Sequence, residues 1–286
     1  MARISELLAA GRTFSFEFFP PKDDAEHARL VATLADLQPL RPSFVSVTYR
    51  GGRESRKRTV DLVTGMLRTT TLTPMAHLIC VAHTRLELAR ILVELREGGV
   101  ENLMALGGDP PDHPGAGEGE LRYARDLVEL ARAVGGFSIG VAAHPAGHPR
   151  SPDLATDRDH LAAKLRDADF AVTQFFFSAD DYHRLVDDLA ARGVHKPVVP
   201  GIMPVTTLGS IDRMAKMGAA VPRAMAERLR SAGDPASVRA AGIEAATELC
   251  RDVLEAGAPG LHFYTLNASG ATRDIFANLG FGALAG

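Results

Sequence analysis

The chain alternates short apolar runs with longer segments whose apolar residues recur every three or four positions. The short runs are rich in β-branched and aromatic residues, and nearly all are continuously apolar, which is typical of strands buried on both faces. Eight such runs occur, and they predict eight strands. The predicted strands are Thr13–Phe19, Phe44–Tyr49, Met75–Val81, Asn102–Leu106, Ser138–Ala143, Ala171–Phe177, Val198–Met203 and Leu261–Leu266.

The longer segments between these runs have the spacing of amphipathic helices. Regular alternation of strand and helix predicts right-handed crossovers and a parallel sheet. Eight units in 286 residues favour a single (β/α)₈ TIM barrel over residues 1–286, with an open doubly wound sheet as the alternative. We expect an extra short helix in Gly218–Pro235, before the last strand. The helices predicted most clearly are Ala25–Leu37, Arg85–Glu97, Arg122–Ala133, Asp180–Ala191 and Ser237–Ala256.

Composition narrows the class of protein. A content of 46% hydrophobic and 23% charged residues is ordinary for a globular enzyme, and a net charge of -3 gives no basic footprint for nucleic acid. Cys80 and Cys250 lie far apart and suggest neither a disulfide framework nor a zinc site. No export signal and no apolar run of about 18 residues is found, so we expect a cytoplasmic protein without a membrane span. The sequence leaves open whether the protein forms a homo-oligomer.

One carboxyl group interrupts the first apolar run. Period-two alternation places Ser15 and Glu17 on one face of the strand and three phenylalanines on the other. Because the more apolar face should meet the helices, we expect Glu17 to point toward the barrel mouth, where the active sites of such barrels lie. Burial among phenylalanines should raise the pKa of Glu17 and favour its use as an acid. A structural ion pair with a buried lysine or arginine is the alternative.

Other polar residues follow later strands. Gln174 carries an amide suited to reading the edge of a heterocycle, or to satisfying backbone groups. Asp109 opens a glycine-rich stretch interpreted as a mobile loop, and it is either a turn residue or a ligand for ring N–H groups. His144 and His148 flank a proline-containing turn that lacks a third metal ligand, so we expect no metal. No GxGxxG motif marks a nucleotide-binding doubly wound domain.

Five segments together resemble the methylenetetrahydrofolate reductase family, in order and over nearly the whole chain. The first, FEFFPP, and the third, TQFFF, are the most specific. The segments are Phe16–Pro21, Phe44–Tyr49, Thr173–Phe177, Pro200–Pro204 and His262–Asn267. The fold of this family is the (β/α)₈ barrel predicted above.

The resemblance implies reduction of methylenetetrahydrofolate to methyltetrahydrofolate. It assigns Glu17 as the acid that helps to open the five-membered ring of the folate, which gives an iminium carbon that accepts hydride. It also assigns substrate-binding and cofactor-binding positions. Those for the folate are Asp109, Gln174, Thr48 and Leu266; those for the cofactor are Thr48, His77, Gly108, His144, His148, Asp157 and Lys164.

Most members of this family hold FAD, and this chain departs from them where they bind it. Gly107 replaces an arginine, His144 replaces a tyrosine, and an asparagine and a second arginine become His160 and Ala163. Arginine–pyrophosphate contacts are charge-assisted and bidentate, so their loss should weaken FAD binding. The pattern resembles the flavin-independent branch of the family, in which NADH or NADPH delivers hydride directly.

Three other functions are weighed against direct reduction. The first is an FAD-dependent reductase with compensating contacts from Lys164 or His148, which would be yellow when purified. The second is a noncatalytic folate-binding barrel, against which the intact Glu17 argues. The third, a folate methyltransferase, is disfavoured because no corrinoid partner motif or metal site is visible. The sequence does not decide between NADH and NADPH.

Overall fold

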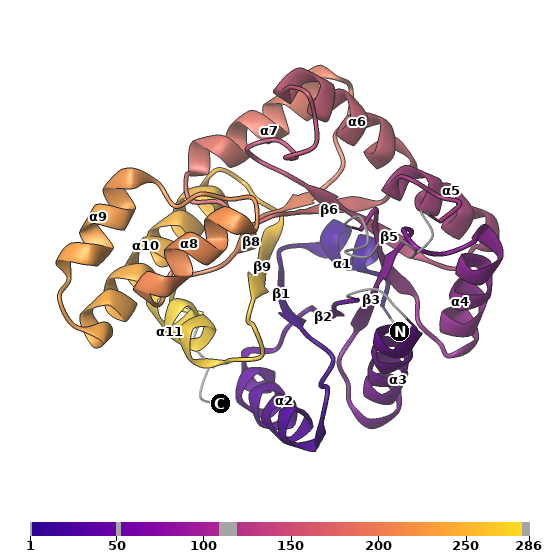
Figure 1. The fold of residues 1–286 in the computed structure, drawn as a ribbon, viewed down its shortest axis with the longest axis horizontal. Helices are drawn as coiled ribbons and strands as arrows, with labels where there is room; N and C mark the ends of the chain where they lie inside the picture. Colours follow the sequence, from indigo (N-terminus) through magenta and orange to yellow (C-terminus); the bar gives the residue numbers. More distant parts are fainter. Residues whose placement is uncertain (1, 50–52, 109–118, 282–286) are drawn as a thin grey trace.

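The computed structural model describes residues 2–49, 53–108 and 119–281, and in them a parallel α/β barrel (Figure 1). All strand pairings are parallel, in the order β7-β6-β5-β4-β3-β2-β1-β9-β8. The predicted fold class is therefore confirmed. The strands are β1 Thr13–Phe18, β2 Phe44–Val47, β3 Pro74–Ile79, β4 Asn102–Leu106, β5 Ser138–Ala143, β6 Phe170–Thr173, β7 Val198–Val199, β8 Gly201–Ile202 and β9 Gly260–Tyr264.

The predicted seventh strand, Val198–Met203, is divided into β7 and β8 at Pro200. Proline has no N–H to donate to a neighbouring strand, so it interrupts the ladder. Before it, β7 pairs with β6, and after it, β8 pairs with β9, where Gly201 lies opposite His262. The covalent continuity through Pro200 therefore connects the two edges of the sheet and completes the ring of strands.

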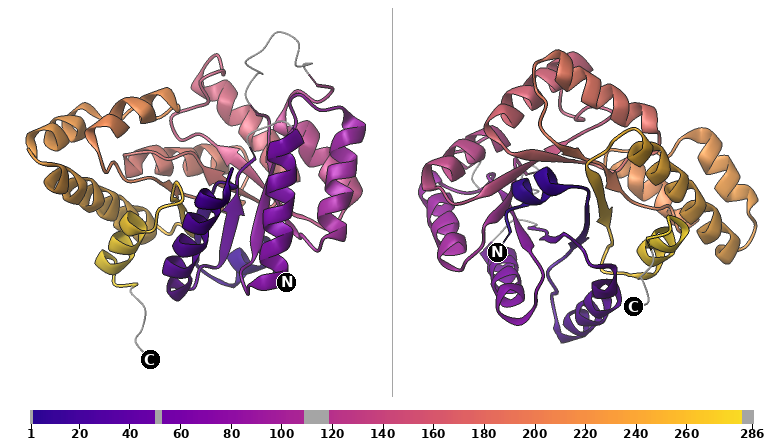
Figure 2. Two further views of the ribbon diagram at one scale, coloured as in Figure 1. Left: turned by 60° about the horizontal axis from the view of Figure 1, so that its bottom comes forward. Right: turned by 180° about the vertical axis from the view of Figure 1, so that it is seen from behind.

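Helices surround the strands on the outside of the barrel (Figures 1 and 2). The five predicted helices are present with ends shifted by at most two residues, and α9 confirms the extra helix expected before the last strand. The helices are α1 Ile4–Ala10, α2 Asp24–Leu37, the short 3₁₀ helix η1 Gln38–Leu40, α3 Arg53–Thr69, α4 Arg85–Glu97, α5 Ala124–Val134, α6 Leu154–Asp167, α7 Ala179–Ala191, α8 Leu208–Lys216, α9 Arg223–Ser231, α10 Pro235–Glu255 and α11 Gly270–Asn278.

Several strands end earlier than predicted. The last one stops at Tyr264 because Leu266 and Asn267 adopt left-handed backbone conformations, with φ of 51° and 58°, which a strand does not accept. β2 also ends before Thr48, and β6 ends before Gln174. Polar and apolar candidate residues therefore lie in the loops at the carboxyl ends of the strands.

The other end of the barrel is covered by α1, which the sequence pattern did not predict (Figure 2, right). The backbone N–H of Ile4 donates to Asn102 Oδ1 at 2.8 Å, and that of Ser5 donates to Ser138 Oγ at 3.0 Å. Ile4 itself is fully buried in a cluster with Phe44. A functional site in this barrel must therefore open at the carboxyl ends of the strands. Among the described residues, no helix is both long and apolar enough to cross a membrane.

Candidate active site

Glu17 projects from β1 into the interior of the barrel. Its neighbours Phe16 and Phe18 are fully buried on the opposite face of the strand, within the core beneath the helices. The carboxylate contacts side chains of β9, which pairs with β1, and of β3, which does not. A side chain of β1 reaches β3 only across the barrel interior, so the inward orientation follows from these contacts.

Two histidines lie beside the same oxygen of this carboxylate. His77 Nε2, from β3, is 3.5 Å from Glu17 Oε2, and His262 Nε2, from β9, is 3.6 Å from it. The other ring nitrogen of His262 lies 2.8 Å from Ser15 Oγ. Both imidazoles are buried. The site is therefore an acid–histidine cluster inside the barrel, and the charged partner considered from the sequence, a lysine or arginine, is not what the structure shows.

The expected rise in the pKa of Glu17 is wrong. Burial does raise this pKa and is the largest single influence. However, the hydrogen bond from His262, the charges of His77 and His262 and the hydroxyl of Ser46 all lower it, and together they hold it below the usual value. Burial lowers the pKa of His77, against the attraction of Glu17. In the free protein the carboxylate of Glu17 is therefore the favoured form.

The loops at the barrel mouth hold three more of the predicted site residues. The Thr48 hydroxyl is buried without a hydrogen-bond partner among the described residues. Gln174 Nε2 donates to the Met217 carbonyl at 3.2 Å, and Gln174 Oε1 accepts from the next backbone N–H, as its alternative interpretation foresaw. Leu266 is 49% exposed. Asp109 and the loop after it lie outside the described residues.

The remaining predicted residues form a second cluster at the carboxyl ends of β4 and β5. The rings of His144 and His148 meet edge to face, with centroids 4.6 Å apart. Asp157 Oδ1 accepts the His148 N–H at 3.1 Å, and Lys164 Nζ donates to the Ala142 carbonyl at 2.7 Å. Among the residues that the structure describes, no third side chain joins the two histidines in a metal-binding group.

Two arginines organise this second cluster, and sequence reasoning missed both. Arg158, on α6, is 1% exposed; it donates to the carbonyls of His144 and Pro145 and pairs with Asp157 and with Asp188 of α7. Arg150 donates to the carbonyl of Gly108, which adopts a left-handed φ of 87° where a β-carbon would meet Val81. No sequence signal marked Arg158, because an arginine in an amphipathic helix is usually exposed.

The buried groups of this cluster have displaced pKa values. Burial, with the nearby charges of His148 and Lys164, lowers the pKa of His144 to about 4, and burial lowers that of Lys164 to about 8, against the attraction of Asp157. His144 is therefore a neutral imidazole at neutral pH. With a pKa of about 8, a fraction of the Lys164 side chains is uncharged at neutral pH.

We expect His144 to make the protein less stable in acid. Its pKa is lowered on folding, so the unfolded chain binds more protons between the unfolded value near 6.5 and about 4, and stability falls as pH falls through that window. The loss is on the order of 3 kcal/mol. In His144→Phe, urea unfolding at pH 7 and pH 4.5 should show a smaller difference than in the wild type. An equal difference in both proteins would contradict the role assigned to His144.

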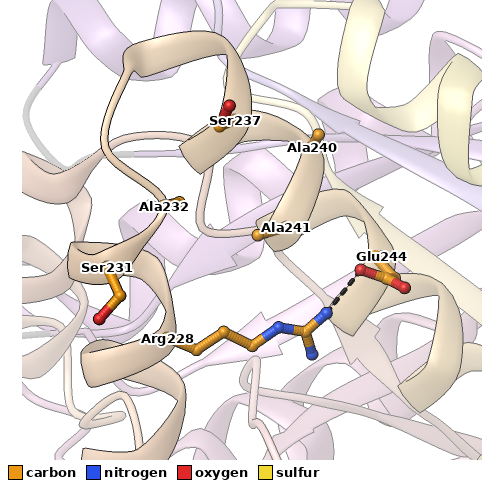
Figure 3. A pocket seen from close by; sticks show the side chains of 7 residues that line it. All are labelled: Arg228, Ser231, Ala232, Ser237, Ala240, Ala241 and Glu244. Carbon is orange, nitrogen blue, oxygen red and sulfur yellow. Dashed lines mark hydrogen bonds and ion pairs between the residues drawn. The ribbon is translucent and has the colours of Figure 1, made fainter.

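A surface depression lies away from these residues (Figure 3). It is open to solvent and lies between α9 and α10, where Arg228 pairs with Glu244 across one side. None of the predicted site residues lines it.

A barrel with an acid–histidine cluster below the carboxyl ends of its strands defines an α/β-barrel enzyme. The model of the methylenetetrahydrofolate reductase family matches residues 3–280. The 5,10-methylenetetrahydrofolate reductase of Escherichia coli (strain K12) is 35% identical over 269 residues, which cover 93% of this chain and 90% of that protein. The chain belongs to the methylenetetrahydrofolate reductase family.

Two further proteins extend the comparison. Methylenetetrahydrofolate reductase (NADH) 1 of Arabidopsis thaliana is 33% identical over 296 residues, which cover 97% of this chain and 50% of the plant protein. A solved structure of an uncharacterized Clostridium thermocellum protein, which binds two copies of 5-methyl-5,6,7,8-tetrahydrofolic acid, superposes with a TM-score of 0.67 at 12% identity and covers 97% of both chains. The second likeness concerns the fold alone.

Proposed function

We propose that this protein reduces 5,10-methylenetetrahydrofolate to 5-methyltetrahydrofolate in the cytoplasm, with NADH or NADPH as direct hydride donor and Glu17 as proton donor. The observation that carries the proposal is the buried carboxylate of Glu17, which faces the barrel interior between His77 and His262 in a chain of this family. The NADH in the name of the plant relative and the folate in that of the Clostridium protein agree with the proposed reactants.

The residues around Glu17 suit a nicotinamide. Thr48 Oγ1 and His77 Nε2 are both buried without a hydrogen bond among the described residues, although His77 Nε2 lies 3.5 Å from Glu17 Oε2. Unsatisfied buried polar atoms are costly, so such atoms indicate a ligand with complementary groups, and a carboxamide has both a donor and an acceptor. Bound there, the reduced nicotinamide supplies the hydride. Burial lowers the pKa of the His77 imidazole, against the attraction of Glu17.

The residues around the second cluster do not suit FAD. A pyrophosphate needs free cationic side chains, and here the cations are engaged within the protein. Arg158 is enclosed by two carboxylates and two backbone carbonyls, and Lys164 donates to the Ala142 carbonyl. His144 stays neutral. Among the described cations of this cluster, exposed Arg150, which donates to the Gly108 carbonyl, is the one that could turn outward, and it lies on a loop.

The chemical task of Glu17 is to deliver a proton to the nitrogen that leaves when the folate ring opens. In the free protein the histidines favour its carboxylate. A folate seated over the barrel mouth excludes water, which raises the free energy of the charged form and shifts the pKa of Glu17 upward. Glu17 is then protonated in the complex and able to act as a general acid. The barrel walls hold the iminium carbon for hydride attack.

We expect flavin-free protein to turn over. The test uses purified protein, shown to be colourless by its absorption spectrum after flavin removal, with methylenetetrahydrofolate and NADH or NADPH in separate reactions. Absorbance of the nicotinamide should fall, and methyltetrahydrofolate should form in equal amount. Activity that appears only after added FAD would contradict direct transfer, and saturable folate binding without any nicotinamide oxidation would indicate the noncatalytic alternative.

A further inference from the structure

His262 is the more deeply buried of the two histidines beside the Glu17 carboxylate. It lies on β9 with 1% of its surface exposed, next to β1 in the sheet. Among the described residues, the polar and titratable groups that face Glu17 come from three strands. They are Ser46 of β2, His77 of β3, and His262 and Tyr264 of β9.

The ring of His262 is held on every side. It stacks on Phe44 with an interplanar angle of 15° and a centroid distance of 6.1 Å, and it meets Tyr264 edge to face at 5.3 Å. Tyr264 is itself fixed, because its hydroxyl donates to the Thr173 carbonyl at 2.6 Å. These contacts prevent the imidazole from turning, so Nε2 stays directed at the carboxylate.

The hydroxyl of Ser15 sets which nitrogen of His262 carries the hydrogen. Ser15 Oγ lies 2.8 Å from His262 Nδ1 and 3.4 Å from the Leu261 carbonyl. Either atom can supply the hydrogen of the 2.8 Å contact, and we assign it to the hydroxyl, because the 3.4 Å contact with the Leu261 carbonyl is long for an O–H···O hydrogen bond. A neutral imidazole that accepts at Nδ1 carries its hydrogen on Nε2. Nε2 lies 3.5 Å from Ser46 Oγ and 3.6 Å from Glu17 Oε2, and long contacts of this kind tighten in catalytic complexes.

We propose that His262 is the positioning residue for Glu17: held by Ser15, it presents Nε2–H to Oε2 and leaves Oε1 as the oxygen that carries the transferable proton. The inference rests on the proposed function, which makes Glu17 the acid. It also assigns Ser15 a role in the reaction, through the tautomer of His262. A donor to the carboxylate makes the carboxyl group a stronger acid, which suits proton delivery to a weakly basic nitrogen.

Two substitutions distinguish the effect of the N–H donor of His262 from the effect of the packing of its ring. His262→Phe keeps a flat ring against Phe44 and removes the N–H, whereas His262→Gln keeps an amide N–H at the position of Nε2. Because Glu17 must be protonated to act, activity falls as pH rises through its pKa in the complex. Loss of the donor disfavours the carboxylate and raises that pKa, so the alkaline limb of kcat should move up by about one to two pH units in His262→Phe.

The experiment measures kcat against pH in the wild type, His262→Phe, His262→Gln and Ser15→Ala, each checked for folding by circular dichroism and thermal melting. We expect the alkaline limb of His262→Gln to stay near the wild-type position and that of Ser15→Ala to move partway toward the limb of His262→Phe. A limb that stays in place in His262→Phe while kcat falls would overturn the proposal, since packing alone would then explain the loss. Ser15→Ala supplies the milder test if His262→Phe fails to fold.

A second readout does not depend on turnover. In ligand-free protein labelled with ¹³C at the glutamate carboxyls, the resonance that Glu17→Gln removes reports the titration of Glu17. In His262→Phe this resonance should titrate at higher pH than in the wild type. If the Glu17 resonance titrates at higher pH in His262→Phe but neither this variant nor the wild type reduces folate, the Glu17–His262 coupling is supported and the proposed function is contradicted. An unchanged titration in an active enzyme would overturn the role of His262 alone.

Discussion

Glu17→Gln is expected to lower kcat by about a hundredfold or more, the scale usual for a positioned general acid. Glutamine has nearly the same shape and stays polar, so it should remain between His77 and His262 without disturbing the barrel. It has no proton that it can transfer at neutral pH. Ring opening of the folate then depends on water, while the walls that bind the folate and the nicotinamide are unchanged. The loss should therefore appear in kcat and leave the KM values near those of the wild type.

Steady-state kinetics with both substrates, together with folate binding followed by calorimetry, would measure this separation. Glu129→Gln is a matched control. It removes the same charge as Glu17→Gln, but on the exposed surface of α5, where Glu129 pairs with Arg125. Its turnover should stay within about twofold of the wild type, as is usual for an exposed ion pair. Near-normal turnover in Glu17→Gln would remove Glu17 from the mechanism. A loss of folate affinity with unchanged kcat would make it a binding residue.

The barrel could be predicted because its strands are buried on both faces and its helices on one. Continuous apolar runs and helical periodicity report those two kinds of burial directly. The ends of the strands could not be predicted, because they depend on backbone conformation. Leu266 and Asn267 turn into the left-handed region although both follow an apolar run, and Pro200 divides a strand that otherwise reads as continuous.

The direction of Glu17 could also be predicted, since strand alternation needs only local sequence. The pKa of Glu17 could not, because its partners come from distant parts of the chain. His77 and His262 reach the same carboxylate oxygen only when β3 and β9 close around β1. His262 is next to apolar Phe263 in a run that reads as plain core, and its position opposite Ser15 is known only once β9 pairs with β1.

Arg158→Met is expected to lower the free energy of unfolding by about 3–5 kcal/mol, the range for removing one partner of a buried ion pair. The side chain of Arg158 is 1% exposed and serves four acceptors at once. Methionine fills a similar volume but donates to none of them. In this variant Asp188 still has Arg192 nearby as a cationic partner, and Asp157 still accepts the backbone N–H of His148. The carbonyls of residues 144 and 145 lose their arginine donor, which carries the largest part of the expected loss.

Urea unfolding of the wild type, Arg158→Met and Arg158→Lys would test this. Lysine restores the charge but not the planar fork, so Arg158→Lys should recover only part of the stability. Arg223→Met is the control: Arg223 pairs with Glu227 on the surface of α9 and is 91% exposed, so its loss should cost under about 1 kcal/mol. A change below about 1 kcal/mol in Arg158→Met would contradict the argument, because a buried cation with four acceptors would then contribute no more than an exposed one.

Arg158 also connects stability to function, because the two carbonyls that it holds belong to the turn that carries His144 and His148. When this turn loosens, the edge-to-face pair of imidazoles loses its fixed geometry. The family resemblance implies that these histidines bind the cofactor, so folded Arg158→Met at low temperature should show a raised KM for NADH with the KM for folate nearly unchanged. A rise in both KM values would indicate that the turn also contacts the folate. If neither KM value rises, Arg158 contributes to stability alone.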